Sequence, residues 1–200
     1  MIRCKKRKDD VNMCRKLAEL HNKKPNDFLS GNPKLPVDIY QILQDLNVRC
    51  FCVNFNGLQK DLAFDNAKII GLAYAHKNDL FIFYSDHSDL PTARFTLAHE
   101  LAHCCLHMND DAAFHIEMQT IPDVIHFNGK VSKSFNRKKE VEADVFAREL
   151  LIPTNALIHI LRSVKDPSIE ELADLFIVPK EEIANKLIDV KTHLLSQKRK

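Results

Sequence analysis

The chain has 200 residues, of which 45% are hydrophobic and 28% are charged, and its formal net charge is +2. These values are ordinary for a globular protein, so they exclude extended disorder and a strong overall attraction to nucleic acid. The length allows one domain with a core of its own, or one domain with a small appendage. Short basic runs, RCKKRK near the start and QKRK at the end, are typical of solvated tails.

The six cysteines include no CxxC pair, so they indicate neither a zinc ribbon nor a disulfide framework. Cys104 and Cys105 are neighbours in an apolar segment, which is typical of reduced, buried thiols. No apolar stretch of a secretory signal follows the charged start, and no run is long enough to span a bilayer. We therefore expect a soluble protein of the reducing cytoplasm, without a membrane partner.

The first half of the chain predicts two helices and a small sheet. Residues 11–22 have helical spacing, a proline-rich linker follows, and residues 38–46 again have helical spacing. Residues 48–55 are rich in apolar and aromatic side chains, which predicts a strand. Residues 69–75 and 80–84 are expected to form a hairpin around the turn-prone HKND.

The second half is predicted to be mostly helical. Residues 90–108 have the broadest apolar surface, and Pro91 suits the first turn of a helix there. Residues 109–137 form a long mixed stretch that is difficult to assign, and long loops of this kind are often functional. A helix at 138–151 is halted by Pro153, and two shorter helices are expected at 169–176 and 180–189.

These elements predict an α+β fold. A small, mostly antiparallel sheet is expected to pack on the helix at 90–108 and on a second helix at 138–151. The expected divisions of the chain are an N-terminal helix and linker at 1–34, a core at 35–153, and a C-terminal helical segment with a basic tail at 154–200.

The first of these helices contains an HExxH motif, formed by His99, Glu100 and His103. Residues four apart on a helix face the same way, so both histidines can direct a ring nitrogen at one ion. Glu100 lies beside that ion, where it can hold a water molecule. Chance occurrence is the alternative, but two histidines and a glutamate on an apolar helix are costly to bury without a cation.

A catalytic zinc needs a third protein ligand and an open fourth position. His107 continues the row of histidines, but eight helical residues rise about 12 Å, too far for one ion to bind both His99 and His107. We expect His107 to be structural or helix-terminal, where a cation would suit the helix dipole.

The next helix offers better candidates, because Glu140 and Asp144 are four residues apart and share a face. Glu140 can supply a carboxylate to the metal, and Asp144 can accept the free ring N–H of His99. Glu142 is the rival ligand, and its side chain is expected to point away from that of Glu140, so only one of the two can bind the metal. A solvated acidic face is the alternative interpretation of this segment.

The segments RFTLAHELAHCCLH and EVEADVFARELLIP together resemble the ImmA/IrrE family of zinc metallopeptidases. Members show a similar RFTLAHELGH–LH stretch followed by ExEAxxFAxxLLMP, and the likeness covers residues 35–189. Ala102 stands where the family usually has glycine, and Ile152 stands where methionine is frequent. Neither departure removes a candidate ligand.

The resemblance implies a gluzincin-like site, with His99, His103 and Glu140 on Zn²⁺ and Glu100 as the base, and it favours Glu140 over Glu142. It also implies a substrate, because family members are associated with mobile elements, stress responses and toxin–antitoxin-like operons. That substrate is an XRE-type helix-turn-helix transcriptional repressor, whose cleavage or inactivation switches genes on.

Two other functions are compatible with the residues. A zinc-containing binding module would sequester a repressor, toxin or antitoxin without cleaving it. A direct DNA-binding regulator is suggested by the two short C-terminal helices, although Glu181, Glu182 and Asp189 on the second of them would repel phosphate.

A peptidase of this kind also needs a second donor for the developing oxyanion and a place for an extended substrate. Tyr74, Tyr84, His115 and His126 are the candidate donors, and the residues leave the choice open. A substrate strand is expected to add to an edge of the sheet, for which residues 80–84 are a candidate.

Overall fold

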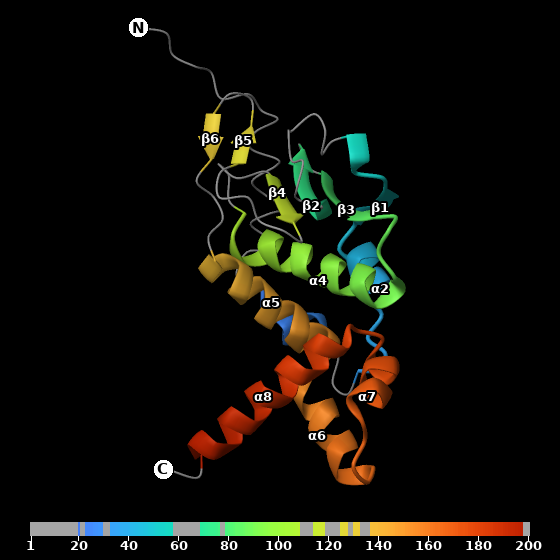
Figure 1. Ribbon diagram of the computed structural model, residues 1–200. Coiled ribbons are helices and arrows are strands. Elements are labelled where there is room, and N and C mark those ends of the chain that lie inside the picture. The colour runs from blue at the N-terminus through green and yellow to red at the C-terminus, as the bar shows by residue number, and fades with distance from the viewer. Residues whose placement is uncertain are drawn as a thin grey trace, which may run out of the picture.

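The computed structural model describes residues 20, 23–29, 33–57, 69–76, 79–108, 114–118, 125–127, 130–132 and 137–197. It has the predicted α+β fold, with a sheet on one side of α4 and the C-terminal helices on the other (Figure 1). The helix expected at 11–22 lies outside the described residues, apart from Leu20. The proposed division at 34 and 153 stays a prediction.

The main sheet has four strands in the order β1–β3–β2–β4. β1 (Val48–Val53) pairs in parallel with β3 (Asp79–Ser85), whereas β2 (Ile69–His76) pairs antiparallel with β3 and with β4 (Phe114–Met118). The mostly antiparallel sheet and the β2–β3 hairpin are therefore confirmed. The expectation of a free edge at 80–84 is wrong, because β3 is hydrogen-bonded on both sides and β4 is an outer strand.

In the long stretch at 109–137, the described residues form three short strands, β4 and the antiparallel pair β5 (Ile125–Phe127) and β6 (Lys130–Ser132). The helices are η1 (Pro25–Phe28), α2 (Ile39–Asp45), α4 (Leu90–Leu106), α5 (Arg137–Leu151), α6 (Thr154–Ser163), α7 (Ile169–Phe176) and α8 (Lys180–Gln197). Among the described residues, no helix combines the length and apolar character needed to cross a bilayer.

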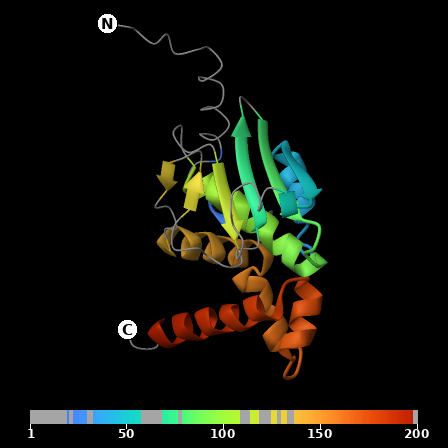
Figure 2. The ribbon, with the colours of Figure 1, turned by 45° about the horizontal axis from the view of Figure 1, so that its top comes forward.

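One face of the sheet is covered by α4, which runs behind the strands in Figure 2. Leu80 and Ile82 of β3 alternate toward this face, and both are completely buried in the core that they share with Leu97 and Leu101 of α4. Every residue of α4 from Ala93 to Cys105 is buried. A helix enclosed on all sides can hold polar side chains only where they meet partners, so its histidines must lie against polar groups.

Asp89 begins α4, because its side chain accepts a hydrogen bond of 2.9 Å from the backbone N–H of Thr92. Asp89→Ala is expected to lower the free energy of unfolding by about 1 kcal/mol. Hydrogen bonds from the side chain and from the backbone N–H of Thr92 lower the pKa of Asp89, so the contribution of the charged cap is present above the ordinary pKa and is lost as the pH falls through the folded-state pKa.

Urea unfolding near neutral pH and in strong acid measures this difference. Asp89→Asn is the matched control, since asparagine caps a helix as well as aspartate does but does not titrate. An Asp89→Ala deficit that is equally large at both pH values would contradict the assignment.

Ion pairs attach α8 to α5. Arg148 donates from Nε to Glu182 at 2.9 Å and from Nη1 to Asp189 at 3.1 Å, and Lys186 pairs with Glu149. Two acidic side chains of α8 therefore face α5. α8 continues as one helix to Gln197, beyond the predicted end at residue 189.

Arg94 of α4 attaches further segments of the chain to the core. Its Nη2 donates to the carbonyl of Val37, ahead of α2, and its Nε donates to the carbonyl of Ile177, between α7 and α8.

The helix α6 was not predicted from the sequence. Pro153 was interpreted only as the end of α5, but it is also the N-cap residue of α6.

Candidate metal centre

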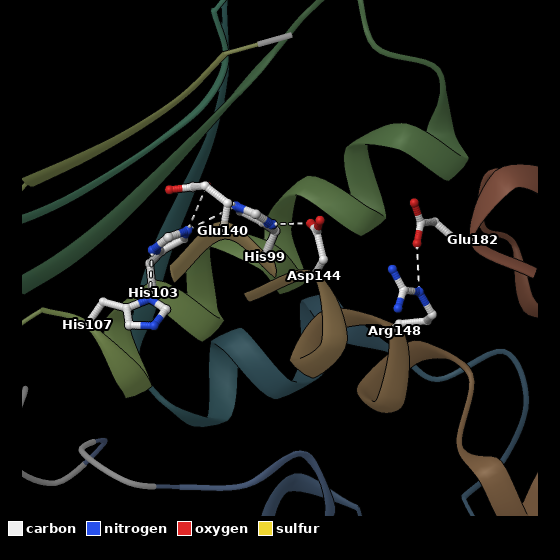
Figure 3. A network of polar contacts seen from close by, with 7 residues as sticks. All are labelled: His99, His103, His107, Glu140, Asp144, Arg148 and Glu182. Carbon is white, nitrogen blue, oxygen red and sulfur yellow. Dashed lines mark hydrogen bonds and ion pairs between the residues drawn. The ribbon is translucent and has the colours of Figure 1, made fainter. Parts of the chain in front are cut away.

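The candidate centre lies where α5 packs against α4 (Figure 3). His99 and His103 come from the middle of α4, one turn apart, and Glu140 comes from the first turn of α5. The two imidazoles are almost fully buried, with 2% and 1% of their residue surface exposed, whereas the Glu140 side chain is 19% exposed. One ligand atom from each of the three lies within 4.8 Å of the others.

The distances between these atoms are close to those around a single ion. Nε2 of His103 is 3.0 Å from Nε2 of His99, and Oε2 of Glu140 is 3.3 Å from each of these nitrogens. Ligand atoms with bonds of about 2.0–2.1 Å to a tetrahedral zinc would lie about 3.3 Å apart. Two nitrogens and one carboxylate oxygen are also the ligand set that catalytic zinc prefers, so these residues fit the ion that the motif implies.

Asp144 lies beside the other nitrogen of His99. Its Oδ1 is 2.9 Å from Nδ1 of His99, one helical turn beyond Glu140 on α5. If Nε2 of His99 offers its lone pair to a metal, the ring proton is on Nδ1, from which Asp144 can accept a hydrogen bond. The contact expected from the spacing of Glu140 and Asp144 is present in the structure.

Glu100 is fully buried in the middle of α4, next to His99 in the chain. Glu142 lies elsewhere: its Oε2 is 3.0 Å from Nε2 of His107. Glu140 rather than Glu142 therefore lies with the two histidines of the motif.

His107 caps the C-terminus of α4, the helix-terminal position that was expected. Its Nδ1 is 3.0 Å from Nδ1 of His103, a contact that the sequence analysis missed although the i, i+4 spacing of the two residues could have shown it. Burial is the largest influence on His107 and lowers its pKa, and the bond to Glu142 acts in the opposite direction. The neutral imidazole is thus favoured over the cation that was expected at this helix end.

The candidate oxyanion donors lie in different surroundings. Tyr74 is exposed on β2, where its ring stacks on Phe81 at 6.3 Å. Burial, together with Tyr40 and Cys52, raises the pKa of Tyr84 to about 12. The backbones of His115 and His126 lie in β4 and β5, but their side chains are outside the described part of the structure. The second donor stays a prediction.

An α+β fold that combines a buried HExxH helix with a carboxylate from the next helix is the arrangement of a metallopeptidase-type domain. The chain belongs to the Peptidase_M78 family, whose model, the IrrE N-terminal-like domain, matches residues 62–187. The resemblance to the ImmA/IrrE family is thereby confirmed, and membership supports a peptidase that acts on a protein substrate. A comparison with curated protein sequences found no match.

Proposed function

We propose that the chain is a zinc-dependent, gluzincin-like endopeptidase of the cytoplasm. His99, His103 and Glu140 would hold the ion, and Glu100 would act as the general base. The observation that supports this best is the convergence of two buried imidazole nitrogens and one carboxylate oxygen at mutual distances of 3.0–3.3 Å.

When bound, zinc supplies Lewis-acid polarisation of a scissile carbonyl and acidifies a water molecule. Glu100 would accept the proton of the attacking water and deliver it to the leaving amine. Asp144 would hold the ring of His99 in one tautomer and one orientation, because a carboxylate 2.9 Å from Nδ1 can accept a hydrogen bond from the N–H at that position. The outer strand β4 would offer backbone groups to an extended substrate segment.

The proposed substrate is an XRE-type helix-turn-helix repressor of a mobile element or a stress response. Family membership supports a protein substrate, and the choice of a repressor rests on the ImmA/IrrE resemblance alone. Cleavage would remove the repressor from its operator and switch on the genes that it controls.

The test is to incubate the zinc-loaded protein with an XRE-type repressor encoded next to its gene and to analyse the products by mass spectrometry. Two fragments whose new C-terminus and new N-terminus meet at one peptide bond would support cleavage. A stable complex with an intact repressor would overturn cleavage and support sequestration instead. An intact repressor without a complex would overturn the proposed substrate.

The described residues do not favour the DNA-binding alternative. Glu182 and Asp189 of α8 are engaged by Arg148, and Lys186 is buried against Glu149. Among the described side chains of α8, Lys180 and Lys191 are the exposed cations, and they lie too far apart along the helix to form the row of cations that phosphate binding requires.

A further inference from the structure

The two histidines of the candidate centre differ in the group that contacts Nδ1, the ring nitrogen directed away from the three-atom cluster. Nδ1 of His99 meets a carboxylate directly, at 2.9 Å from Asp144. Nδ1 of His103 meets a second imidazole, at 3.0 Å from Nδ1 of His107, and Nε2 of His107 lies 3.0 Å from Oε2 of Glu142. Figure 3 shows His107 beside His103, on the side away from His99.

The direction of these bonds follows from the proposed role of His103, on which this inference rests. If Nε2 of His103 offers its lone pair to a metal, Nδ1 carries the proton and must donate it. Nδ1 of His107 is then the acceptor, so the proton of that ring is on Nε2. Nε2–H in turn donates to the Glu142 carboxylate, and each group in the row has one partner of the correct kind.

We propose that His107 and Glu142 are positioning residues, which hold His103 in the tautomer and ring orientation needed to bind zinc. They would do for His103 what Asp144 does for His99. Outer carboxylates of this kind fix the ring orientation of a ligating histidine and make its free nitrogen more basic.

The surroundings of His107 hold its ring in place. Its backbone N–H donates to the carbonyl of His103 at 2.9 Å, and its side chain is only 8% exposed. Glu142 is bound on its other oxygen, since Oε1 lies 3.8 Å from Nζ of Lys138 one turn earlier. The Glu142 carboxylate therefore contacts His107 through one oxygen and Lys138 through the other.

The three carboxylates in these described contacts all come from one helix, α5. Glu140 faces Nε2 of His99 and of His103, Asp144 accepts from His99, and Glu142 accepts from His107. Any shift of α5 along α4 would disturb all of these bonds together. The geometry of the metal centre therefore depends on how α5 packs on α4.

The first test measures zinc affinity by competition with a chelator, using zinc alone as the probe. His107→Phe removes both bonds of the ring and is expected to weaken zinc binding about 10–100-fold, as Asp144→Ala should on the other side. His107→Asn is the rescue variant, because its side-chain oxygen can accept from His103 where Nδ1 did, and it should recover most of the affinity. Leu106→Ala, at the neighbouring position on α4, is the control for general damage to the helix end and should bind zinc as the wild type does.

Thermal unfolding without zinc accompanies each affinity measurement. If His107 is only structural, both His107 variants and Leu106→Ala should unfold at lower temperature without zinc. None of them should then lose zinc affinity specifically, and that result would overturn the positioning role. If the wild type binds zinc and His107→Phe binds it equally well, the positioning role of His107 and Glu142 is wrong, while the proposed enzyme function stands. If the wild type binds no zinc, the proposed function and the positioning role of His107 and Glu142 are both wrong.

The second test does not depend on a variant that folds. Long-range ¹H–¹⁵N spectra of the zinc-loaded wild type, labelled in its histidine rings, report which nitrogen of each ring carries a proton. Protons on Nδ1 of His103 and on Nε2 of His107 are expected. A proton on Nδ1 of His107, or a His107 ring that exchanges between tautomers, would overturn the positioning role.

Discussion

Glu100→Gln is expected to abolish cleavage and to leave zinc bound. Glutamine has nearly the same shape as glutamate, so the packing of this fully buried side chain in α4 should survive. It cannot accept a proton from water, however, and the loss of a general base slows a reaction by about 10²–10⁴-fold. The measurements are the rate of fragment formation from the repressor and the zinc content of the purified variant.

Glu170→Gln is the matched control for Glu100→Gln, because it makes the same chemical change on the exposed surface of α7. It should cleave at the wild-type rate. A Glu100→Gln protein that contains zinc and still cleaves at the wild-type rate would show that another group accepts the proton.

Glu140→Ala is expected to lose zinc. The carboxylate of Glu140 lies 3.3 Å from both ligand nitrogens, and the described residues place no second acid within the same group of atoms. Removal of a group next to a ligand already weakens metal binding about 10–100-fold, so removal of a ligand itself should exceed that range. Competition with a chelator measures the change, and cleavage should disappear with the ion.

Glu142→Ala is the control for this variant, because it removes the same carboxylate two residues later on the same helix. Its expected effect is no more than about 10-fold, since Glu142 acts on His103 only through His107. If Glu142→Ala loses zinc and Glu140→Ala keeps it, the ligand assignment is reversed.

Helical periodicity explains how much of the centre could be predicted from the sequence. His99 and His103 share a face of one helix, and Glu140 and Asp144 share a face of another, because residues four apart are always neighbours. The contact between His103 and His107 follows from the same rule. It was missed because His107 was judged only by its distance from His99, which excludes a shared ion but not a bond to the nearer histidine.

Contacts between helices were predicted less well. Glu142 was expected to point away from Glu140, but the sequence does not contain the crossing of α4 and α5 that brings Glu142 and His107 together. That crossing results from packing between apolar side chains distant in sequence, such as Leu97 and Leu150, rather than from a local pattern.

The sheet and the C-terminal helices show the same limit. The β2–β3 hairpin is local and was predicted, but the parallel pairing of β1 with β3 joins strands separated by the hairpin partner, so the inner position of β3 was not foreseen. The attachment of α8 to α5 likewise involves Arg148, which belongs to another helix and is distant in sequence. Local patterns determine single elements, and long-range packing determines their neighbours.

The central claim is that α4 and α5 bind one zinc ion between them. A crystal of the zinc-loaded protein, measured above and below the zinc absorption edge, tests this claim directly. The account predicts one anomalous peak per chain, bonded to Nε2 of His99, Nε2 of His103 and a carboxylate oxygen of Glu140. A fully loaded crystal without a peak at that position, or with its peak on other side chains, would contradict it.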